Sequence, residues 1–218
     1  MIEQGPLNLE SIGPGTHVCF IYDSADQRLD AIGRIMAGVL RGGGSTAYFA
    51  WESDLDLIRN HLRLRGVPVH LLDEPTFTVE PAAEVYTAGR RFDKDRMLGL
   101  LRQGYDRMRT QVNGTVFFTG EMEWSRQPEL TGVDQLVAYE QAVNDVIRTH
   151  PFSAICQYDA RAFDGDLLFR IVKAHPLMLV RNQILANPYY VPAAASEDGH
   201  GHEHDHACGC GHQAHGHA

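Results

Sequence analysis

Short apolar segments alternate with amphipathic helical segments along most of this chain, and this alternation limits the folds that the chain can adopt. An apolar, β-like run at 18–22 is followed by leucine, isoleucine and methionine side chains at helical spacing over 29–40. Three glycines at 42–44 then end the helix, and a second β-like run follows at 46–51. Strands separated by helices form mainly parallel sheets with helices on both faces. The sequence therefore predicts an α/β fold.

The rest of the chain continues this pattern as far as residue 186. Ser24 begins a capping box, Ser53 is a second predicted cap, and Asp93 is expected to begin a long helix. A hairpin around Arg181 and Asn182 is expected to close the sheet. The remaining predicted strands are 67–72, 77–79, 115–119 and 154–158, and the remaining predicted helices are 53–66, 93–108, 133–147 and 165–174.

The domain organisation follows from length and from one change of composition. A chain of 218 residues can form one sizeable core and is short for two. We expect an N-terminal extension at 1–15, one folded domain at 16–192 and a flexible tail at 193–218, because apolar residues almost disappear after residue 192. The formal net charge of −9 argues against direct binding to nucleic acid. Without a signal-peptide pattern or a long apolar run, the protein is expected to be cytoplasmic.

Polar and aromatic side chains follow the predicted strands, where ligands bind in open parallel sheets. Carboxylates, aromatic faces and one arginine at a sheet edge could hold a small organic ligand by stacking and hydrogen bonds. The same residue types also serve as helix caps, rim packing and ion pairs, and this alternative stays open. The predicted ligand-binding residues are Tyr22, Asp23, Glu52, Glu121, Glu123, Trp124, Tyr158, Asp159 and Arg161.

The sequence lacks a phosphate-binding loop between the first predicted strand and helix. Such a loop has the pattern G-x-x-x-x-G-K-[ST], because backbone amides and the lysine must meet the phosphates. This chain has Asp23-Ser-Ala-Asp-Gln-Arg28 there, with carboxylates that would repel phosphate. No ATP binding is therefore expected.

Two cysteines lie inside apolar β-like runs and are expected to be buried, reduced thiols. His17 and Cys19 are predicted to share one strand face because side chains alternate along a strand. This pattern fits a core-packed pair or a catalytic or metal-binding pair, and the frequent burial of cysteine favours the core. Sequence alone assigns no histidine partner to Cys156.

Six segments, taken in order, resemble the MEDS domain, the methanogen/methylotroph sensory domain named after the dichloromethane-responsive repressor DcmR. The resemblance covers about residues 16–192. The segments are His17-Val-Cys-Phe-Ile-Tyr22, Gly89-Arg-Arg-Phe-Asp-Lys-Asp-Arg-Met97, Thr119-Gly-Glu-Met-Glu-Trp124, Cys156-Gln-Tyr-Asp159, His175-Pro176 and Asn187-Pro-Tyr-Tyr-Val-Pro192.

This resemblance implies a RecA/KaiC-like fold whose phosphate loop has decayed, used as a sensory module for small signals, often one-carbon or hydrocarbon-derived. It also implies that Glu121, Glu123, Trp124, Tyr158 and Asp159 lie around the ligand. This chain departs from the repressor pattern because it has no N-terminal helix-turn-helix segment and carries the tail. Any effect on transcription would then require a partner protein.

The tail is rich in histidine and contains two cysteines, which together suit Zn, Ni, Cu or Co. The ligands alternate with Gly, Asp, Glu and Ala and show no fixed tetrahedral spacing, so several exchanging ligand sets are expected. The interleaved acids and cysteines also distinguish this segment from a purification tag. The predicted metal ligands are His200, His202, His204, His206, Cys208, Cys210, His212, His215 and His217.

Three functional hypotheses are consistent with these sequence features. The first is a non-enzymatic sensory or regulatory domain that binds a small ligand at the strand ends, couples it to a partner regulatory protein and binds a transition metal in the tail. The second is a metallochaperone or metal-storage protein that delivers Ni, Zn, Cu or Co to a metalloenzyme. The third is an enzyme, either a divergent nucleotide hydrolase or an acid/base catalyst using Glu121 and Glu123. No membrane partner is expected, and a homo-oligomer is compatible with all three.

Overall fold

The fold is built around a seven-stranded sheet with the strand order β3-β2-β6-β7-β1-β8-β9. We describe it from a computed structural model that covers residues 9, 12–51, 53–73 and 75–193. The strands from β3 to β8 in this order are parallel, and β9 is antiparallel to β8. The predicted α/β fold with a mainly parallel sheet is therefore confirmed. No helix in the described part is long and apolar enough to cross a membrane.

The elements have the following bounds. The strands of the sheet are β1 (His17–Tyr22), β2 (Ser45–Ala50), β3 (Phe77–Pro81), β6 (Val116–Glu121), β7 (Ser153–Asp159), β8 (Leu177–Val180) and β9 (Gln183–Ala186), and β4 (Thr87–Ala88) pairs with β5 (Arg91–Phe92). The helices are α1 (Ala25–Arg41), α2 (Leu55–Leu64), α3 (Ala82–Tyr86), α4 (Lys94–Arg109), α5 (Leu136–Thr149) and α6 (Gly165–Ala174), with 3-10 turns η2 (Val69–Leu71), η3 (Met122–Arg126) and η4 (Val133–Gln135).

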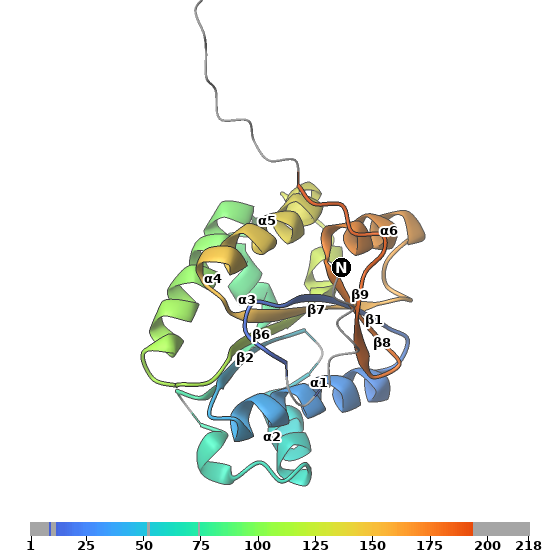
Figure 1. Cartoon of the computed structure of the whole chain (residues 1–218). Helices are drawn as coiled ribbons and strands as arrows, with labels where there is room; N and C mark the ends of the chain where they lie inside the picture. Colours follow the sequence, from blue (N-terminus) through green and yellow to red (C-terminus); the bar gives the residue numbers. More distant parts are fainter. Residues whose placement is uncertain (1–8, 10–11, 52, 74, 194–218) are drawn as a thin grey trace, which may run out of the picture.

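Helices cover both faces of the sheet, with α1 and α2 on one face and α4, α5 and α6 on the other (Figure 1). Strand β6 shows why both faces need cover. Its neighbouring residues Phe117 and Phe118 point to opposite sides, and both are buried, at 0% and 4% exposed. Phe117 packs in the core with α1, and Phe118 packs in the core with α4 and α5. The central strands are therefore apolar on both sides.

Helix caps explain where several helices begin. Ser24 accepts a hydrogen bond from the backbone N–H of Gln27, and Asp93 accepts one from that of Arg96, which confirms both predicted caps. The prediction for Ser53 was wrong by one residue. Asp54 caps α2 instead, because its carboxylate accepts from the Leu57 N–H and also suits the positive end of the helix dipole.

The predicted strand at 67–72 is wrong, since this segment forms the 3-10 turn η2. Pro68 lacks the N–H that a strand ladder requires, and it precedes the turn as its N-cap. The strand that pairs with β2 at the edge of the sheet is β3, which begins at Phe77, in the segment predicted to be strand-like. Because β3 is an edge strand, it tolerates Pro81 at its end.

The last two strands form the predicted hairpin around Arg181 and Asn182. Both residues have positive φ, 47° and 61°, as a type I′ turn requires. This hairpin adds β8 next to β1, so that β1 lies between two parallel neighbours.

Gly132 gives a testable consequence of the fold. It has φ of +80°, and a Cβ there would collide with the carbonyl oxygen of Phe92. Gly132→Ala is therefore expected to lower the free energy of unfolding by about 2 to 4 kcal/mol in a urea titration. Gly99→Ala is the control, because a Cβ there meets nothing within 4 Å and Gly99 lies inside α4. Gly99→Ala is expected to raise the free energy of unfolding by about 0.5 to 1 kcal/mol. If both variants lowered the free energy of unfolding equally, the clash at Gly132 would not be the cause of the loss.

Candidate functional site

Four of the predicted ligand-binding residues meet at the carboxyl end of the sheet. Strand β1 leads through α1 to β2 on one side, whereas β7 leads through α6 to β8 on the other. The connections after β1 and β7 therefore diverge, which is where open α/β sheets bind ligands. The backbone brings Tyr22, Glu121, Glu123 and Asp159 to this edge.

Glu121 is fully buried, and Arg28, Tyr48 and the backbone of Trp51 are among the groups that hold it. Its Oε1 forms an ion pair with Arg28 Nη1 at 2.5 Å and accepts a hydrogen bond from the Tyr48 hydroxyl at 2.6 Å. Its Oε2 accepts a hydrogen bond from the backbone N–H of Trp51 at 3.0 Å. Arg28 lies on α1 and is 3% exposed, so the ion pair is closed to water. This carboxylate thus ties α1, β2 and β6 together.

Glu123 forms a second link across the same edge. Its Oε1 accepts hydrogen bonds from the Tyr22 hydroxyl and from the backbone N–H of Asp159, both at 2.8 Å. Its Oε2 is buried and has no hydrogen-bond partner among the described residues. Burial raises the pKa of Glu123 above its usual value, and its hydrogen bonds only partly oppose this effect. Glu123 is therefore the strand-end carboxylate with an acceptor oxygen to spare.

The other predicted residues occupy different surroundings. Asp159 holds its exposed neighbour Arg161 through three hydrogen bonds, with the backbone N at 2.8 Å and Nε at 2.9 Å from Oδ1, and Nη2 at 2.5 Å from Oδ2. Asp23 is exposed. Trp124 and Tyr158 are fully buried in the core under α4, α5 and α6. Glu52 and the predicted metal ligands of the tail lie outside the described residues.

A second group of polar side chains lies inside the core between the sheet and helices α5 and α6. His17, Glu140, Cys156 and His175 come from four different elements, and their possible ligand atoms all lie within 4.8 Å of one another. All four side chains are buried, with exposed fractions between 0% and 6%. This group could hold a metal ion, since imidazole, thiolate and carboxylate are all ligands of transition metals.

Glu140 is the centre of this group. Its Oε2 lies 3.3 Å from Nε2 of His17, 3.3 Å from Nε2 of His175 and 3.2 Å from Sγ of Cys156. Its Oε1 accepts a hydrogen bond from the Tyr158 hydroxyl at 2.5 Å. Burial by itself raises the pKa of Glu140, but the two histidines outweigh burial and bring this pKa below its usual value. Burial also lowers the pKa of His17 and raises that of the Cys156 thiol.

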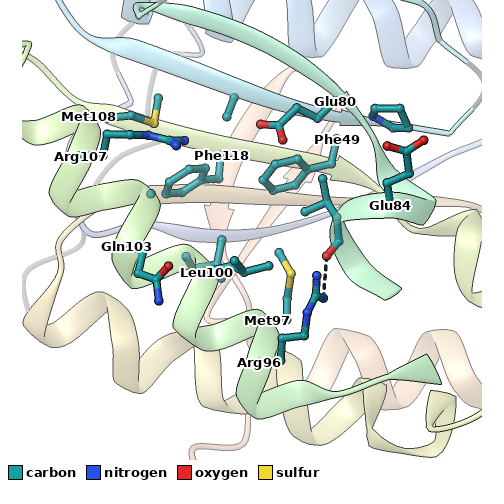
Figure 2. A pocket seen from close by; sticks show the side chains of 15 residues that line it. Phe49, Glu80, Glu84, Arg96, Met97, Leu100, Gln103, Arg107, Met108 and Phe118 are labelled. Carbon is teal, nitrogen blue, oxygen red and sulfur yellow. Dashed lines mark hydrogen bonds between the residues drawn. The ribbon is translucent and has the colours of Figure 1, made fainter. Parts of the chain in front are cut away.

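An open cavity of about 530 Å³ lies between the sheet and α4. Its floor is apolar and includes Phe49 and Phe118, whose rings stack at 6.2 Å. Figure 2 shows these rings facing Met97 and Leu100 of α4. Charged and polar residues from α3, α4 and the end of β3 surround the apolar floor; they are Glu80, Glu84, Arg96, Gln103 and Arg107.

Two comparisons with known proteins identify the family and the fold. The model of the family MEDS, described as MEthanogen/methylotroph, DcmR Sensory domain, matches residues 16–176. The chain belongs to the MEDS family. Its role is accordingly sensory or regulatory. Among curated proteins, no sequence matches this chain.

Among the solved structures with a fold similar to this MEDS domain are two archaeal proteins. One is the flagellar accessory protein FlaH from Methanocaldococcus jannaschii, with a TM-score of 0.55, 14% identity and coverage of 77% of this chain and 71% of that chain. Another is the uncharacterized protein PH0321 from Pyrococcus horikoshii, solved in complex with an unknown peptide, with a TM-score of 0.57, 12% identity and coverage of 80% and 82%. The similarity to FlaH confirms the RecA/KaiC-like fold implied by the resemblance.

Sequence reasoning did not bring the buried group of the MEDS domain together. It paired His17 with Cys19 on one strand, whereas the structure places His17 Nε2 at 3.6 Å from Sγ of Cys156 on the neighbouring strand. One signal was present, because His17, Cys156 and His175 each lie in a segment that carries the MEDS resemblance. Glu140 lies in none of those segments, and only the packing of α5 shows its place.

Proposed function

We propose that this MEDS domain binds a small signal molecule in the cavity between the sheet and α4 and passes the signal to a partner regulatory protein. The observation that carries the proposal is the cavity itself, about 530 Å³ in volume and open to solvent. Small-molecule sites are typically concave, about 300 to 1,000 Å³ in volume, and mainly apolar with a few polar groups. The cavity lies in this size range and is concave, and it combines an apolar floor with a charged and polar rim.

The lining of the cavity suits a small molecule that has both an apolar part and a polar part. Phe49, Phe118 and Leu100 offer apolar surface, whereas Glu84 and Arg107 offer charge at the rim. Arg96 is already held by the backbone carbonyl of Val85 at 2.9 Å, so its guanidinium is oriented before any ligand binds (Figure 2). Such an arrangement would bury the apolar part and orient the polar end.

The position of the cavity suggests how binding could reach a partner. Its walls come from α3, from α4 and from strands β2 and β6, which belong to the rigid sheet. A ligand that fills the space would restrain the two helices against the sheet, and a ligand can shift an equilibrium only through such a difference in contacts. The partner would then recognise the restrained position of α4.

The strand-end cluster predicted from the sequence is the second candidate for this ligand site. The buried Oε2 of Glu123 lacks a hydrogen-bond partner in the described part and could accept a hydrogen bond from a ligand. Glu121, another buried carboxylate of the cluster, is already engaged by Arg28, Tyr48 and Trp51. That engagement does not favour the alternative in which Glu121 activates water for nucleotide hydrolysis.

Binding of a panel of small organic molecules, measured by calorimetry, separates the two sites. Leu100→Trp is expected to weaken binding at least about tenfold, because the indole would occupy the apolar part of the cavity. Glu123→Gln is expected to leave affinity unchanged. The control Leu57→Trp places the same indole on α2, where Leu57 is 43% exposed, and is expected to bind like the original protein. Loss in Glu123→Gln with normal binding in Leu100→Trp would move the site to the strand ends.

The tail of the chain completes the proposal. We propose that the histidines and cysteines at 200–217 bind Zn, Ni, Cu or Co, as their side-chain chemistry predicts. A metallochaperone or storage role remains the alternative. Deletion of 197–218 distinguishes the two, because a sensor would keep its ligand response, whereas a chaperone would lose delivery of metal to its partner enzyme.

A further inference from the structure

The geometry points to a metal site that is separate from the tail: we propose that His17, Glu140, Cys156 and His175 together bind one transition-metal ion, with Zn²⁺ or Co²⁺ as the best fit. This proposal goes beyond the small-molecule site and does not depend on it. Four elements contribute one ligand each: the first residue of β1, the middle of α5, the middle of β7 and the residue that follows α6.

Four of the six separations between the ligand atoms are close to those around a tetrahedral ion, and the other two are no longer than 4.8 Å. Around tetrahedral Zn²⁺, with bonds of about 2.0 to 2.1 Å to nitrogen or oxygen and about 2.3 Å to sulfur, neighbouring ligand atoms lie about 3.3 to 3.6 Å apart. Glu140 Oε2 lies 3.3 Å from each histidine Nε2 and 3.2 Å from the Cys156 Sγ. The Cys156 Sγ lies 3.6 Å from the His17 Nε2. The nitrogen–oxygen separations are longer than ordinary hydrogen bonds.

The outer contacts orient both imidazoles toward this centre. His175 Nδ1 lies 2.8 Å from the carbonyl of Ile171, so it must carry a proton and donate. His17 Nδ1 lies 3.0 Å from Oδ1 of Asn144, and Asn144 Nδ2 donates to the Ala174 carbonyl, which fixes the amide orientation. In a neutral ring, each Nε2 therefore presents a lone pair to the centre. Metal-binding histidines are typically oriented in this way.

Between the four ligand atoms, hydrogen-bond acceptors outnumber hydrogen-bond donors. His175 Nε2 is buried and makes no hydrogen bond of acceptable geometry within the described residues, although Glu140 Oε2 is near. Two imidazole lone pairs and a carboxylate oxygen at such distances need positive charge at the centre, supplied either by protons on the imidazoles or by a metal ion. A metal ion would engage all four ligand atoms at once. A doubly charged ion bound by one carboxylate and one thiolate would leave the site formally neutral, which reduces the cost of burying the charges.

The ligand set also indicates the class of metal and site. Two imidazoles, one carboxylate and one thiolate suit Zn²⁺ and Co²⁺ better than Mg²⁺ or Ca²⁺, which prefer oxygen ligands. Four protein ligands are typical of a closed, structural site rather than a catalytic site with an open position. Because the group is buried, we expect the ion to enter as the protein folds and to exchange slowly afterwards.

The test uses the full-length chain carrying Cys208→Ser and Cys210→Ser, so that the tail offers no thiolate. This reference protein is refolded from urea with Co²⁺ and then washed with a chelator that competes with the histidines of the tail for the ion. We expect about one Co²⁺ per chain to stay, with a tetrahedral visible spectrum and a thiolate-to-cobalt charge-transfer band. Cys156→Ser in this background should lose that band.

Two further variants control for folding and for the role of the outer contacts. Cys19→Ser is the matched control, because Cys19 is also a buried free cysteine and lies directly opposite Cys156 on β1; it should keep the band. Asn144→Ala keeps all four ligands and should lower Co²⁺ affinity about 10- to 100-fold.

Two results would overturn the proposal. One is a folded reference protein that retains no ion after the wash, and the other is an unchanged charge-transfer band in Cys156→Ser. If Cys156→Ser does not fold, X-ray absorption of the Zn²⁺-loaded reference protein decides. One sulfur and three nitrogen or oxygen neighbours would support the site, and a zinc shell without sulfur would rule it out.

Discussion

Glu140→Ala is expected to lower the free energy of unfolding by about 3 to 5 kcal/mol in a urea titration at neutral pH with a chelator present. Glu140 is fully buried, and its carboxylate is the shared partner of Tyr158, Cys156 and the two histidines. Removing it leaves the Tyr158 hydroxyl and the Cys156 thiol buried without their acceptor, takes the negative charge away from the two histidines, and opens a cavity. These effects act in the same direction.

The matched control for this prediction is Asp145→Ala on the same helix. Asp145 forms an ion pair with Arg148 at 2.7 Å, but the two side chains are 52% and 74% exposed. Surface pairs of this kind contribute about 0 to 1 kcal/mol. If Glu140→Ala destabilised the protein no more than Asp145→Ala, the buried contacts of Glu140 would not stabilise the fold.

Arg28→Met is expected to cost about 3 to 5 kcal/mol, because it leaves the carboxylate of Glu121 buried without a counter-charge. Arg28 and Glu121 are 3% and 0% exposed, so water cannot take the place of the lost guanidinium. The double variant Arg28→Met/Glu121→Gln is expected to recover at least half of this loss. Its neutral amide oxygen can still accept the hydrogen bond that the Trp51 N–H donates, and its NH2 group can donate to the Tyr48 hydroxyl.

Urea titrations of the two single variants and the double variant form a complete cycle. Arg34→Met is the control on the same helix, since Arg34 pairs with Asp30 at a surface where the side chains are 47% and 39% exposed. It should cost less than about 1 kcal/mol. If the double variant lowered the free energy of unfolding by the sum of the two single-variant effects, the two residues would act independently. That result would contradict the ion pair between Arg28 and Glu121.

The sequence predicted most elements of the fold because their signals are local. The capping residues Ser24 and Asp93 lie beside the helices that they begin, and the turn at Arg181 lies between the strands that it joins. The segment at 67–72 misled the prediction because its apolar composition matches a strand, whereas Pro68 removes a ladder hydrogen bond. The apolar composition of this segment gives no sign that the backbone N–H is missing at Pro68.

The strand-end cluster was predictable in part. Glu121, Glu123 and Asp159 follow or end parallel strands, and parallel strands bring their carboxyl ends to one edge. Tyr158 points away from that cluster because it shares a face with Cys156, two residues earlier on β7. Trp124 lies in a 3-10 turn and stacks on Tyr86 at 4.6 Å, a contact that no local pattern indicated.

The sequence by itself determined the α/β fold, the family resemblance and the separate character of the tail, because periodicity, motif order and composition are properties of the chain. Only the tertiary structure brought His17, Glu140, Cys156 and His175 together, because β1 pairs with β7 and because α5 and α6 pack over them. The cavity beside α4 was likewise decided by helix packing. Distances between residues far apart in sequence depend on how the layers pack, and no local pattern encodes them.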